Sequence, residues 1–380
     1  MSSPTVSRRR CLLQLATAAG GAILPSRVAA DEVPKPTDAQ RASMEKLARK
    51  FMGDFKVPGL SIAFAHRERP SFSTSYGFAD AESREELTAD HRFRIASVSK
   101  PLTSIALFQL MEDGKLALDD KVLGPQGRLG MEIPELKLTP RLRSLTVHHL
   151  LTHTGGGWGN QRNDPMFRNP KLDHAALIES TLRDDPLQHD PGEQYAYSNF
   201  GYCLLGRIIE KAAGVSYEGC VKDRLLKRCG IDGMEIAGNT RDERRPGEVV
   251  YHSRNGDRPY AMNVRRMDAH GGWIARPSEL INILVRVDGG KVRADVLKQP
   301  SGERMFTAST ANPRYACGWA VNQVPNRWHN GSLPGTASIA VITASGMCWA
   351  AMTNARTPGI GPALDRLMWD LARCVPDWKA

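Results

Sequence analysis

Apolar residues along the 380-residue chain recur at two spacings, one typical of helices and one typical of strands. Helical spacing predicts helices over 38–55 and 361–374, and others near positions 97, 147, 173, 199, 216 and 277. Alternating or continuous apolar runs predict strands near positions 61–65, 72–77, 318, 328, 337–343 and 348. The predicted strands therefore gather towards the two ends of the chain, whereas the middle is mainly helical.

This order predicts an α+β fold with a mixed antiparallel sheet that is flanked by helices and built from both chain ends. Residues 31–95 and 267–380 would form the α/β sheet domain, and residues 96–266 would form an inserted, mainly helical domain. The hydrophobic fraction of 41% supplies ample material for a large core.

The segment Ser97-Val98-Ser99-Lys100 opens a predicted amphipathic helix that ends at Gly114. Residues three apart share one helix face, so the Lys100 amine can lie beside the Ser97 hydroxyl. A serine hydroxyl needs an adjacent base to take its proton, and lysine is such a base only where burial or charge lowers its pKa. The alternative interpretation is an N-capping serine with a solvated lysine one turn later.

Two further motifs favour the catalytic interpretation of Ser97 and Lys100 over the N-capping one. In Tyr197-Ser198-Asn199, the tyrosine can shuttle a proton to a leaving group, and the Asn199 amide can hydrogen-bond a substrate or Lys100. The alternative is a turn before a helix, with an ordinary half-buried tyrosine. The segment His329-Asn330-Gly331-Ser332 precedes a predicted buried strand, and Gly331 would let a substrate approach the backbone closely. The alternative there is a hairpin turn.

In this order, the three motifs resemble the set that marks the serine β-lactamase and penicillin-binding superfamily. The chain is similar to the branch related to class C β-lactamases, which also holds carboxylesterases, D-amino-acid-specific peptidases and amidases. The resemblance runs from about residue 37 to about residue 369 and includes segments 150–156, 192–210 and 271–280. It implies the same two-domain architecture, with the active site between the domains and no cofactor.

The resemblance implies a role for each motif residue in a two-step acyl transfer. Ser97 would be the nucleophile, with Lys100 and Tyr197 as acid-base groups. Substrate-binding residues would be Asn199, His329, Gly331 and Ser332, with the backbone N–H groups of Ser97 and Ser332 holding the oxyanion.

Position 329 departs from the usual pattern, because β-lactamases and penicillin-binding proteins usually carry lysine there. A histidine is mostly neutral at pH 7, so its pull on a substrate carboxylate should be weaker. This favours an esterase or D-peptidase-like hydrolase that acts on a small ester or amide. The alternatives are a class C-like β-lactamase, a penicillin-binding DD-peptidase that acts on cell-wall peptide, or a non-catalytic envelope-binding protein.

The N-terminal segment resembles a twin-arginine export signal. Ser7-Arg8-Arg9-Arg10 precedes an apolar stretch over 12–24, and small residues at 28–30 offer a cleavage site before Asp31. The stretch is too short and too rich in glycine and alanine to predict a membrane span. Residues 1–30 would therefore be a cleaved signal of a periplasmic or secreted protein without stable membrane insertion.

Other kinds of site find less support in the sequence. His148, His149 and His153 could suggest a metal, but no carboxylate or cysteine stands at a matching ligand spacing, so a capping or core role is expected. The formal net charge of +10 comes partly from the N-terminal arginines, and the other basic residues are interspersed with acids, which does not predict nucleic-acid binding. The seven cysteines are irregularly spaced, and we expect mostly buried free thiols.

Overall fold

The computed structural model describes residues 33–130, 133, 136–161 and 163–378, so the predicted export signal lies outside the described residues. The helices are α1 Asp38–Phe55, α2 Ser99–Glu112, α3 Pro140–Ser144, α4 Val147–Leu151, α5 His174–Asp184, α6 Asn199–Ala213, α7 Tyr217–Val221, α8 Pro277–Leu284, α9 Gln299–Met305 and α10 Ile360–Arg373. Short 3-10 or π segments are η1 Ala96–Val98, η2 Pro165–Phe167, η3 Lys222–Leu226, η4 Lys227–Cys229, η5 Arg265–Met267 and η6 Pro376–Trp378.

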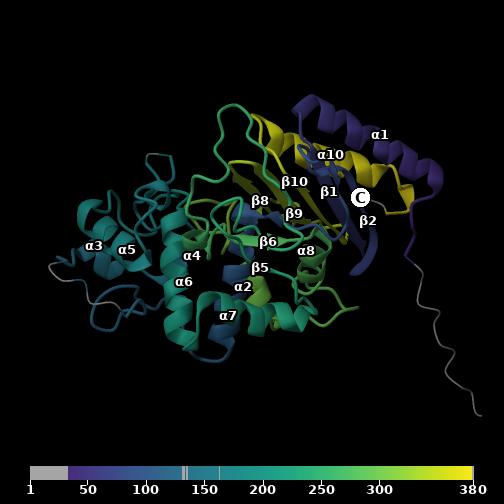
Figure 1. Cartoon of the computed structure of the whole chain (residues 1–380). Coiled ribbons are helices and arrows are strands. Elements are labelled where there is room, and N and C mark those ends of the chain that lie inside the picture. Colours follow the sequence, from purple (N-terminus) through teal and green to yellow (C-terminus); the bar gives the residue numbers. More distant parts are fainter. Residues whose placement is uncertain (1–32, 131–132, 134–135, 162, 379–380) are drawn as a thin grey trace, which may run out of the picture. The chain divides into compact units, whose positions relative to one another are not determined.

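The strands form two antiparallel sheets. They are β1 Gly59–His66, β2 Arg69–Asp80, β3 Glu85–Glu86, β4 Phe93–Arg94, β5 Glu235–Ile236, β6 Trp273–Ala275, β7 Ala320–Val321, β8 Arg327–Leu333, β9 Thr336–Ile342 and β10 Met347–Thr353. The main sheet has the order β3-β2-β1-β10-β9-β8-β7, in which β1 of the N-terminal part pairs with β10 of the C-terminal part (Figure 1). This confirms the predicted α+β fold with a sheet from both chain ends.

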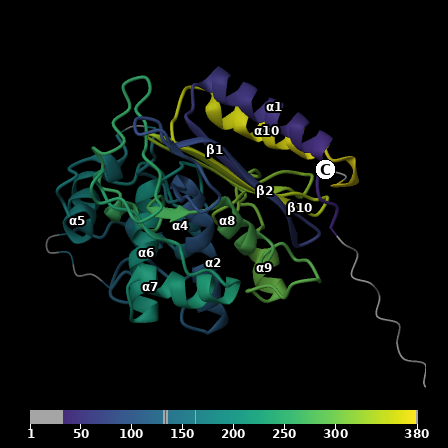
Figure 2. The same cartoon turned by 45° about the vertical axis from the view of Figure 1, so that its right-hand side comes forward.

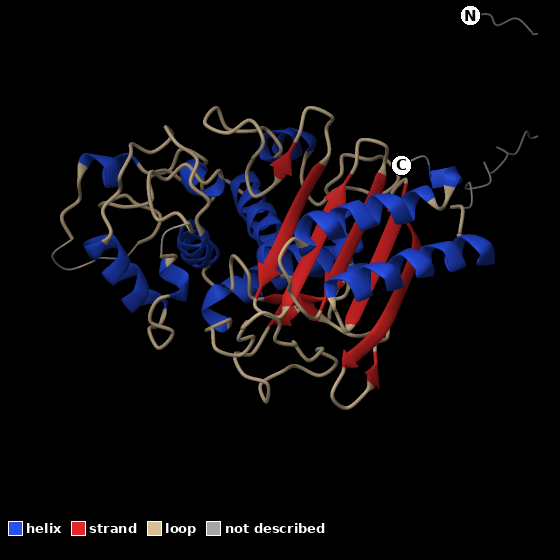
Figure 3. Cartoon of the chain, turned by 90° about the horizontal axis from the view of Figure 1, so that it is seen from above, coloured by secondary structure: helices blue, strands red, loops and turns tan. Residues whose placement is uncertain are grey.

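Helices cover both faces of the main sheet, because its central strands carry apolar residues on both faces. Leu60, Ile62 and Phe64 of β1 belong to the cluster with α1 and α10, which lie side by side along one face (Figures 2 and 3). Ala63 and Ala65 point to the other face, where α8 packs against β1 and β10. Such continuous apolar strands are typical of sheets that are buried on both faces.

Helix α2 is the centre of the helical region, and the prediction that it is amphipathic is wrong. Every residue from Ser99 to Leu110 is buried. The reason is that α6, α7, α9 and η3 all pack against it, so no face of α2 is left for solvent. Sequence periodicity could not show this, because polar residues of α2 such as Lys100, Thr103 and Ser104 are buried and hydrogen-bonded rather than exposed.

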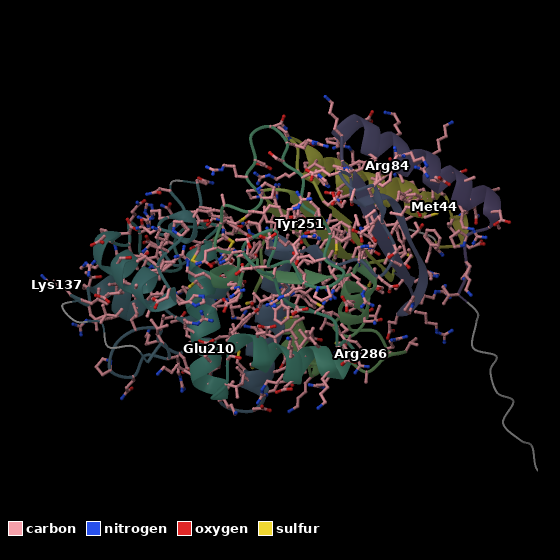
Figure 4. The ribbon with its side chains drawn as sticks, viewed as in Figure 1. Met44, Arg84, Lys137, Glu210, Tyr251 and Arg286 are labelled. Carbon is pink, nitrogen blue, oxygen red and sulfur yellow. The ribbon has the colours of Figure 1, made fainter. Side chains whose placement is uncertain are left out.

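The small sheet β4-β6-β5 leads the chain into the Ser97 segment and was missed by the periodicity, since its strands are two or three residues long. In this sheet, the Arg94 guanidinium is fully buried. It lies 3.7 Å from a carboxylate oxygen of Glu248 and 4.3 Å from the ring centroid of Tyr251, which is labelled in Figure 4. The Tyr251 hydroxyl donates to Glu248 at 2.7 Å and accepts from the Arg94 backbone N–H at 2.7 Å.

The cysteines and the membrane-spanning potential of the described residues can also be compared with the sequence-based expectations. The six cysteines among them are all unpaired, and four of them are buried. None of the helices in this part of the chain is long and apolar enough to cross a membrane.

The buried pair predicts a stability effect at Glu248. Replacing Glu248 with Gln leaves the Arg94 charge buried without its counter-ion, which should lower the free energy of unfolding by about 3–5 kcal/mol. Urea denaturation measures this change. Glu82→Gln, which breaks an exposed ion pair with Arg241, is the matched control and should change stability by less than about 1 kcal/mol. Equal effects of the two variants would contradict the account.

Candidate active site

Ser97 lies in η1, on the short turn between β4 and α2. The preceding residue, Ala96, is buried and has a positive φ of 48°, a conformation that costs energy for a residue with a side chain. Backbone contacts hold this turn from both sheets: the Ile95 N–H donates to the Trp273 carbonyl at 3.0 Å, and the Ser338 hydroxyl donates to the Ile95 carbonyl at 2.7 Å. Ser97 itself is partly exposed.

Gly331 of β8 lies against the same turn. A Cβ atom at this position would be 2.2 Å from the Ile95 carbonyl oxygen and 2.1 Å from the Ser338 hydroxyl. The glycine therefore permits close approach of the chain's own backbone. A close approach by substrate was expected from the sequence, whereas in the structure the Ile95 carbonyl and the Ser338 hydroxyl occupy the space that a side chain would need.

Lys100 is fully buried one turn after Ser97. Its amine is 3.2 Å from the Ser97 hydroxyl, 2.7 Å from the Asn199 side-chain oxygen and 3.2 Å from the His270 carbonyl. Burial lowers the pKa of Lys100 well below its ordinary value, and the nearby Asp164 carboxylate opposes this shift. The solvated lysine of the alternative interpretation is thus excluded for Lys100.

Tyr197 lies beside both groups. The Lys100 amine is 4.6 Å from the centroid of its ring. Burial raises the pKa of Tyr197, and a hydrogen bond with Ser97 acts in the opposite direction. The Tyr197 hydroxyl is therefore protonated at neutral pH and within reach of the Ser97 side chain.

Asn199 begins α6 and connects Lys100 to an acidic residue that the sequence analysis missed. Its side-chain oxygen accepts from Lys100, and its amide donates to Asp164 at 2.7 Å. The backbone N–H of Asn199 donates to the Asn160 side chain at 2.9 Å. Asp164 and Asn160 lie in a loop without periodic apolar residues, so no sequence pattern pointed to them.

His329 is buried, and both of its ring nitrogens have partners. Nε2 lies 3.0 Å from the Tyr315 hydroxyl, and Nδ1 lies 2.7 Å from the Asn330 carbonyl. Burial, followed by the positive charge of Lys100, lowers the pKa of His329 to about 3. The ring is therefore neutral near pH 7, as expected for a histidine at this position.

A pocket of about 390 Å³ opens above Ser97. Of the motif residues, Ser97, Tyr197, Asn199, Gly331 and Ser332 line this pocket, whereas Lys100 and His329 do not. The other lining residues are Asn160, Asp164, Phe167, His270, Gly271, Asn330, Leu333 and Arg356.

Arg356 is the second residue of this pocket that the sequence analysis missed. Its Nε and Nη2 atoms lie 3.0 and 2.5 Å from the two carboxylate oxygens of Asp257, and Nη1 lies 3.4 Å from the Ser332 hydroxyl. It follows β10 by three residues, and no motif distinguishes it from the other arginines of the chain. It is the one lysine or arginine among the described residues that line the pocket.

The histidines that were weighed as metal ligands have other contacts. His149 forms a capping box with Thr146 at the start of α4. The His153 ring accepts from the Ser198 N–H at 3.1 Å. Among the described residues, no group of three or more histidine, cysteine or acidic side chains could hold a metal ion.

The sequence and the fold are similar to those of known proteins. A family model described as "Beta-lactamase" matches residues 44–373. Protein flp of Staphylococcus aureus (strain MW2) is 24% identical over 308 residues, which make up 75% of this chain and 57% of that protein. The chain spans about half the length of the curated relatives it matches.

Two solved structures share the fold. The octameric penicillin-binding protein homologue from Pyrococcus abyssi gives a TM-score of 0.69 at 24% identity, over 90% of this chain and 80% of that one. The D-amino acid amidase from Ochrobactrum anthropi SV3, complexed with L-phenylalanine amide, gives 0.73 at 19% identity, over 90% and 100%. The predicted resemblance is confirmed, since the family model covers most of the chain: the protein belongs to the beta-lactamase family of serine hydrolases.

Proposed function

We propose that this protein hydrolyses a small ester or amide through an acyl-enzyme on Ser97. The observation that carries the proposal is the fully buried Lys100 amine, which lies 3.2 Å from the Ser97 hydroxyl. Burial favours the neutral amine, and only a neutral amine can take the proton of the serine.

The proposed reaction has two halves. Lys100 takes the Ser97 proton as the oxygen attacks the substrate carbonyl, and the backbone N–H groups of Ser97 and Ser332 hold the oxyanion. Tyr197 then protonates the leaving group and recovers a proton from Lys100. In the second half, the same pair activates a water molecule, which releases the acid product and restores Ser97. Asn199 holds the Lys100 amine in place through its side-chain oxygen.

The proposed substrate is uncharged at the position that faces β8. His329 is buried and neutral, so it provides no cation for a substrate carboxylate. An amide substrate is supported by the fold shared with the D-amino acid amidase of O. anthropi. We also propose that residues 1–30 direct twin-arginine export to the periplasm or the medium, which would give the enzyme access to envelope compounds.

Arg356 favours a second candidate function. In this function, the substrate is a peptide or β-lactam that bears a carboxylate, and it acylates Ser97. A guanidinium remains charged at any physiological pH and binds carboxylates well. Asp257 holds Nε and Nη2, which leaves Nη1 on the side of Ser332 and the pocket. The cation that is missing at position 329 would then come from a different loop.

The nucleophile is tested by Ser97→Ala. We expect loss of turnover of p-nitrophenyl butyrate, because the covalent step has no oxygen to form the acyl bond. Ser99→Ala is the matched control, since the Ser99 hydroxyl is buried two residues away without a hydrogen-bond partner. That variant should keep wild-type turnover. Normal activity of Ser97→Ala would remove the basis of the proposal.

The base is tested by Lys100→Arg, because an arginine side chain stays protonated in proteins and therefore cannot take the Ser97 proton. We expect kcat/KM for the ester to fall about 10²–10⁴-fold. In the wild-type protein, kcat/KM should rise with pH through the lowered pKa of Lys100, since only the unprotonated amine is a base. A Lys100→Arg variant with the activity and pH profile of the wild type would exclude Lys100 as the base.

Arg356→Gln separates the two candidate functions. If Arg356 binds a carboxylate, this variant should lower the acylation rate with a chromogenic cephalosporin about ten- to a hundredfold, and leave the rate with the neutral ester unchanged. Arg254→Gln is the charge-matched control, because Arg254 lines a neighbouring pocket but not the Ser97 pocket. Equal effects on cephalosporin and ester would leave the neutral substrate as the better candidate.

A further inference from the structure

His153 binds the backbone on both sides of Tyr197. It follows α4 and is buried, with a positive φ of 58°. Its carbonyl accepts from the Ala196 N–H at 2.8 Å, and its ring Nδ1 accepts from the Ser198 N–H at 3.1 Å. The His153 and Tyr197 rings also pack together in a tilted arrangement, at a centroid distance of 4.2 Å. One residue in an unfavourable backbone conformation thus accepts from the backbone N–H groups of both neighbours of the proposed acid-base tyrosine.

The positions of the ring protons of His153 and His329, and of the Tyr315 hydroxyl proton, follow from their hydrogen-bond partners. Because Nδ1 of His153 accepts an N–H, a neutral ring carries its proton on Nε2, which donates to the Tyr315 hydroxyl at 3.1 Å. The Asn330 carbonyl can only accept, so Nδ1 of His329 carries the proton of that ring. Nε2 of His329 is then an acceptor, and the Tyr315 hydroxyl donates to it at 3.0 Å.

Every hydrogen bond from the Ser198 N–H to the Asn330 carbonyl therefore has one direction. This chain of hydrogen bonds runs from the loop before α6, through His153, Tyr315 and His329, to β8, whose residues 330–333 line the Ser97 pocket. The middle members are buried, so their partners are protein groups rather than water, and the Tyr315 hydroxyl also has a hydrogen bond with the Tyr202 side chain. The two ends of the chain of hydrogen bonds belong to the two segments between which the substrate carbonyl would lie.

We propose that His153 and Tyr315 are positioning residues, which fix the Tyr197 hydroxyl relative to β8 through this directed chain of hydrogen bonds. The inference rests on the proposed role of Tyr197. It adds that the position of the Tyr197 hydroxyl is set by His153 and Tyr315, which do not line the Ser97 pocket. Acid-base catalysis depends on such placement, because a proton moves efficiently only within hydrogen-bond reach.

The chain also predicts a change in pH dependence. The Tyr315 hydroxyl stabilises neutral His329 by donating to its lone pair, so removing it should raise the pKa of His329. The titratable groups that face the chain are Lys100 of α2, Tyr202 of α6, Tyr195 and Tyr197 of the loop before α6, and Cys317. Burial is the main cause that keeps His329 neutral, and a protonated His329 would place a second positive charge near Lys100 and so disturb the Lys100–Tyr197 pair.

The test uses Tyr315→Phe, His153→Ala and His153→Asn in the full chain, with p-nitrophenyl butyrate as substrate. A serine-reactive fluorophosphonate counts active sites, so that kcat refers to folded enzyme. We expect Tyr315→Phe and His153→Ala to lower kcat at least about tenfold. A correctly placed acid-base group accelerates a reaction about 10²–10⁴-fold, and misplacing it should lose part of that factor. In Tyr315→Phe, the acid limb of kcat/KM should move to higher pH. Asparagine tolerates positive φ and its side-chain oxygen can accept from Ser198, so His153→Asn should recover part of the loss.

Tyr195→Phe is the matched control. The Tyr195 ring packs against both His153 and Tyr315, but its hydroxyl takes no part in the chain. We expect wild-type kcat and pH profile for this variant.

The possible results separate the inference from the proposed function. Wild-type kcat per titrated site with an unchanged acid limb in Tyr315→Phe would overturn the inference, and so would a lowered melting temperature as the only change. If these results occur while Ser97→Ala is inactive, the proposed function stands and only the positioning role fails. If Ser97→Ala is active, the proposed function itself fails.

Discussion

The burial of the Lys100 amine is the constraint on which the rest of the site depends. An amine without exposed surface must find hydrogen-bond partners within the protein, and its charged form is disfavoured there. The Asn199 side chain, the His270 carbonyl and the Ser97 hydroxyl supply those partners. The Asp164 carboxylate, which accepts from the Asn199 amide, opposes the lowering of the Lys100 pKa by its negative charge. The same burial that disfavours the ammonium ion also brings a proton acceptor to Ser97.

The scaffold keeps this arrangement by packing around α2 and by fixing the turn before it. Helices α6, α7 and α9 pack around α2, and the Lys100 side chain is fully buried. The turn is held by Trp273 of the small sheet and Ser338 of the main sheet, and Gly331 leaves room for its backbone. A strained residue, Ala96, can persist there because these contacts determine its conformation.

Sequence periodicity predicted most long elements well: α1 spans Asp38–Phe55 as expected, and both ends of the chain contribute to the sheet. The short strands β4–β6 escaped it, because two or three residues show no period. The Ser97, Tyr197 and His329 motifs carry sequence signals, and the structure brings them together. Asp164, Tyr315 and Arg356 could not be predicted, because they reach the site through tertiary contacts from loops without a local pattern. For the same reason, the sequence could suggest His329 as a pocket residue but could not show that Tyr315 and Asn330 occupy its ring nitrogens.

The most direct test of the central claim is to trap the acyl-enzyme and locate it. The mature protein would be mixed with p-nitrophenyl butyrate, quenched in acid within milliseconds, digested, and mapped by peptide mass spectrometry. The account predicts a butyryl group on the Ser97 side chain, which accumulates and decays with turnover. Ester hydrolysis with the acyl group on another residue, or without any covalent intermediate on Ser97 when turnover is slowed at low pH, would contradict it.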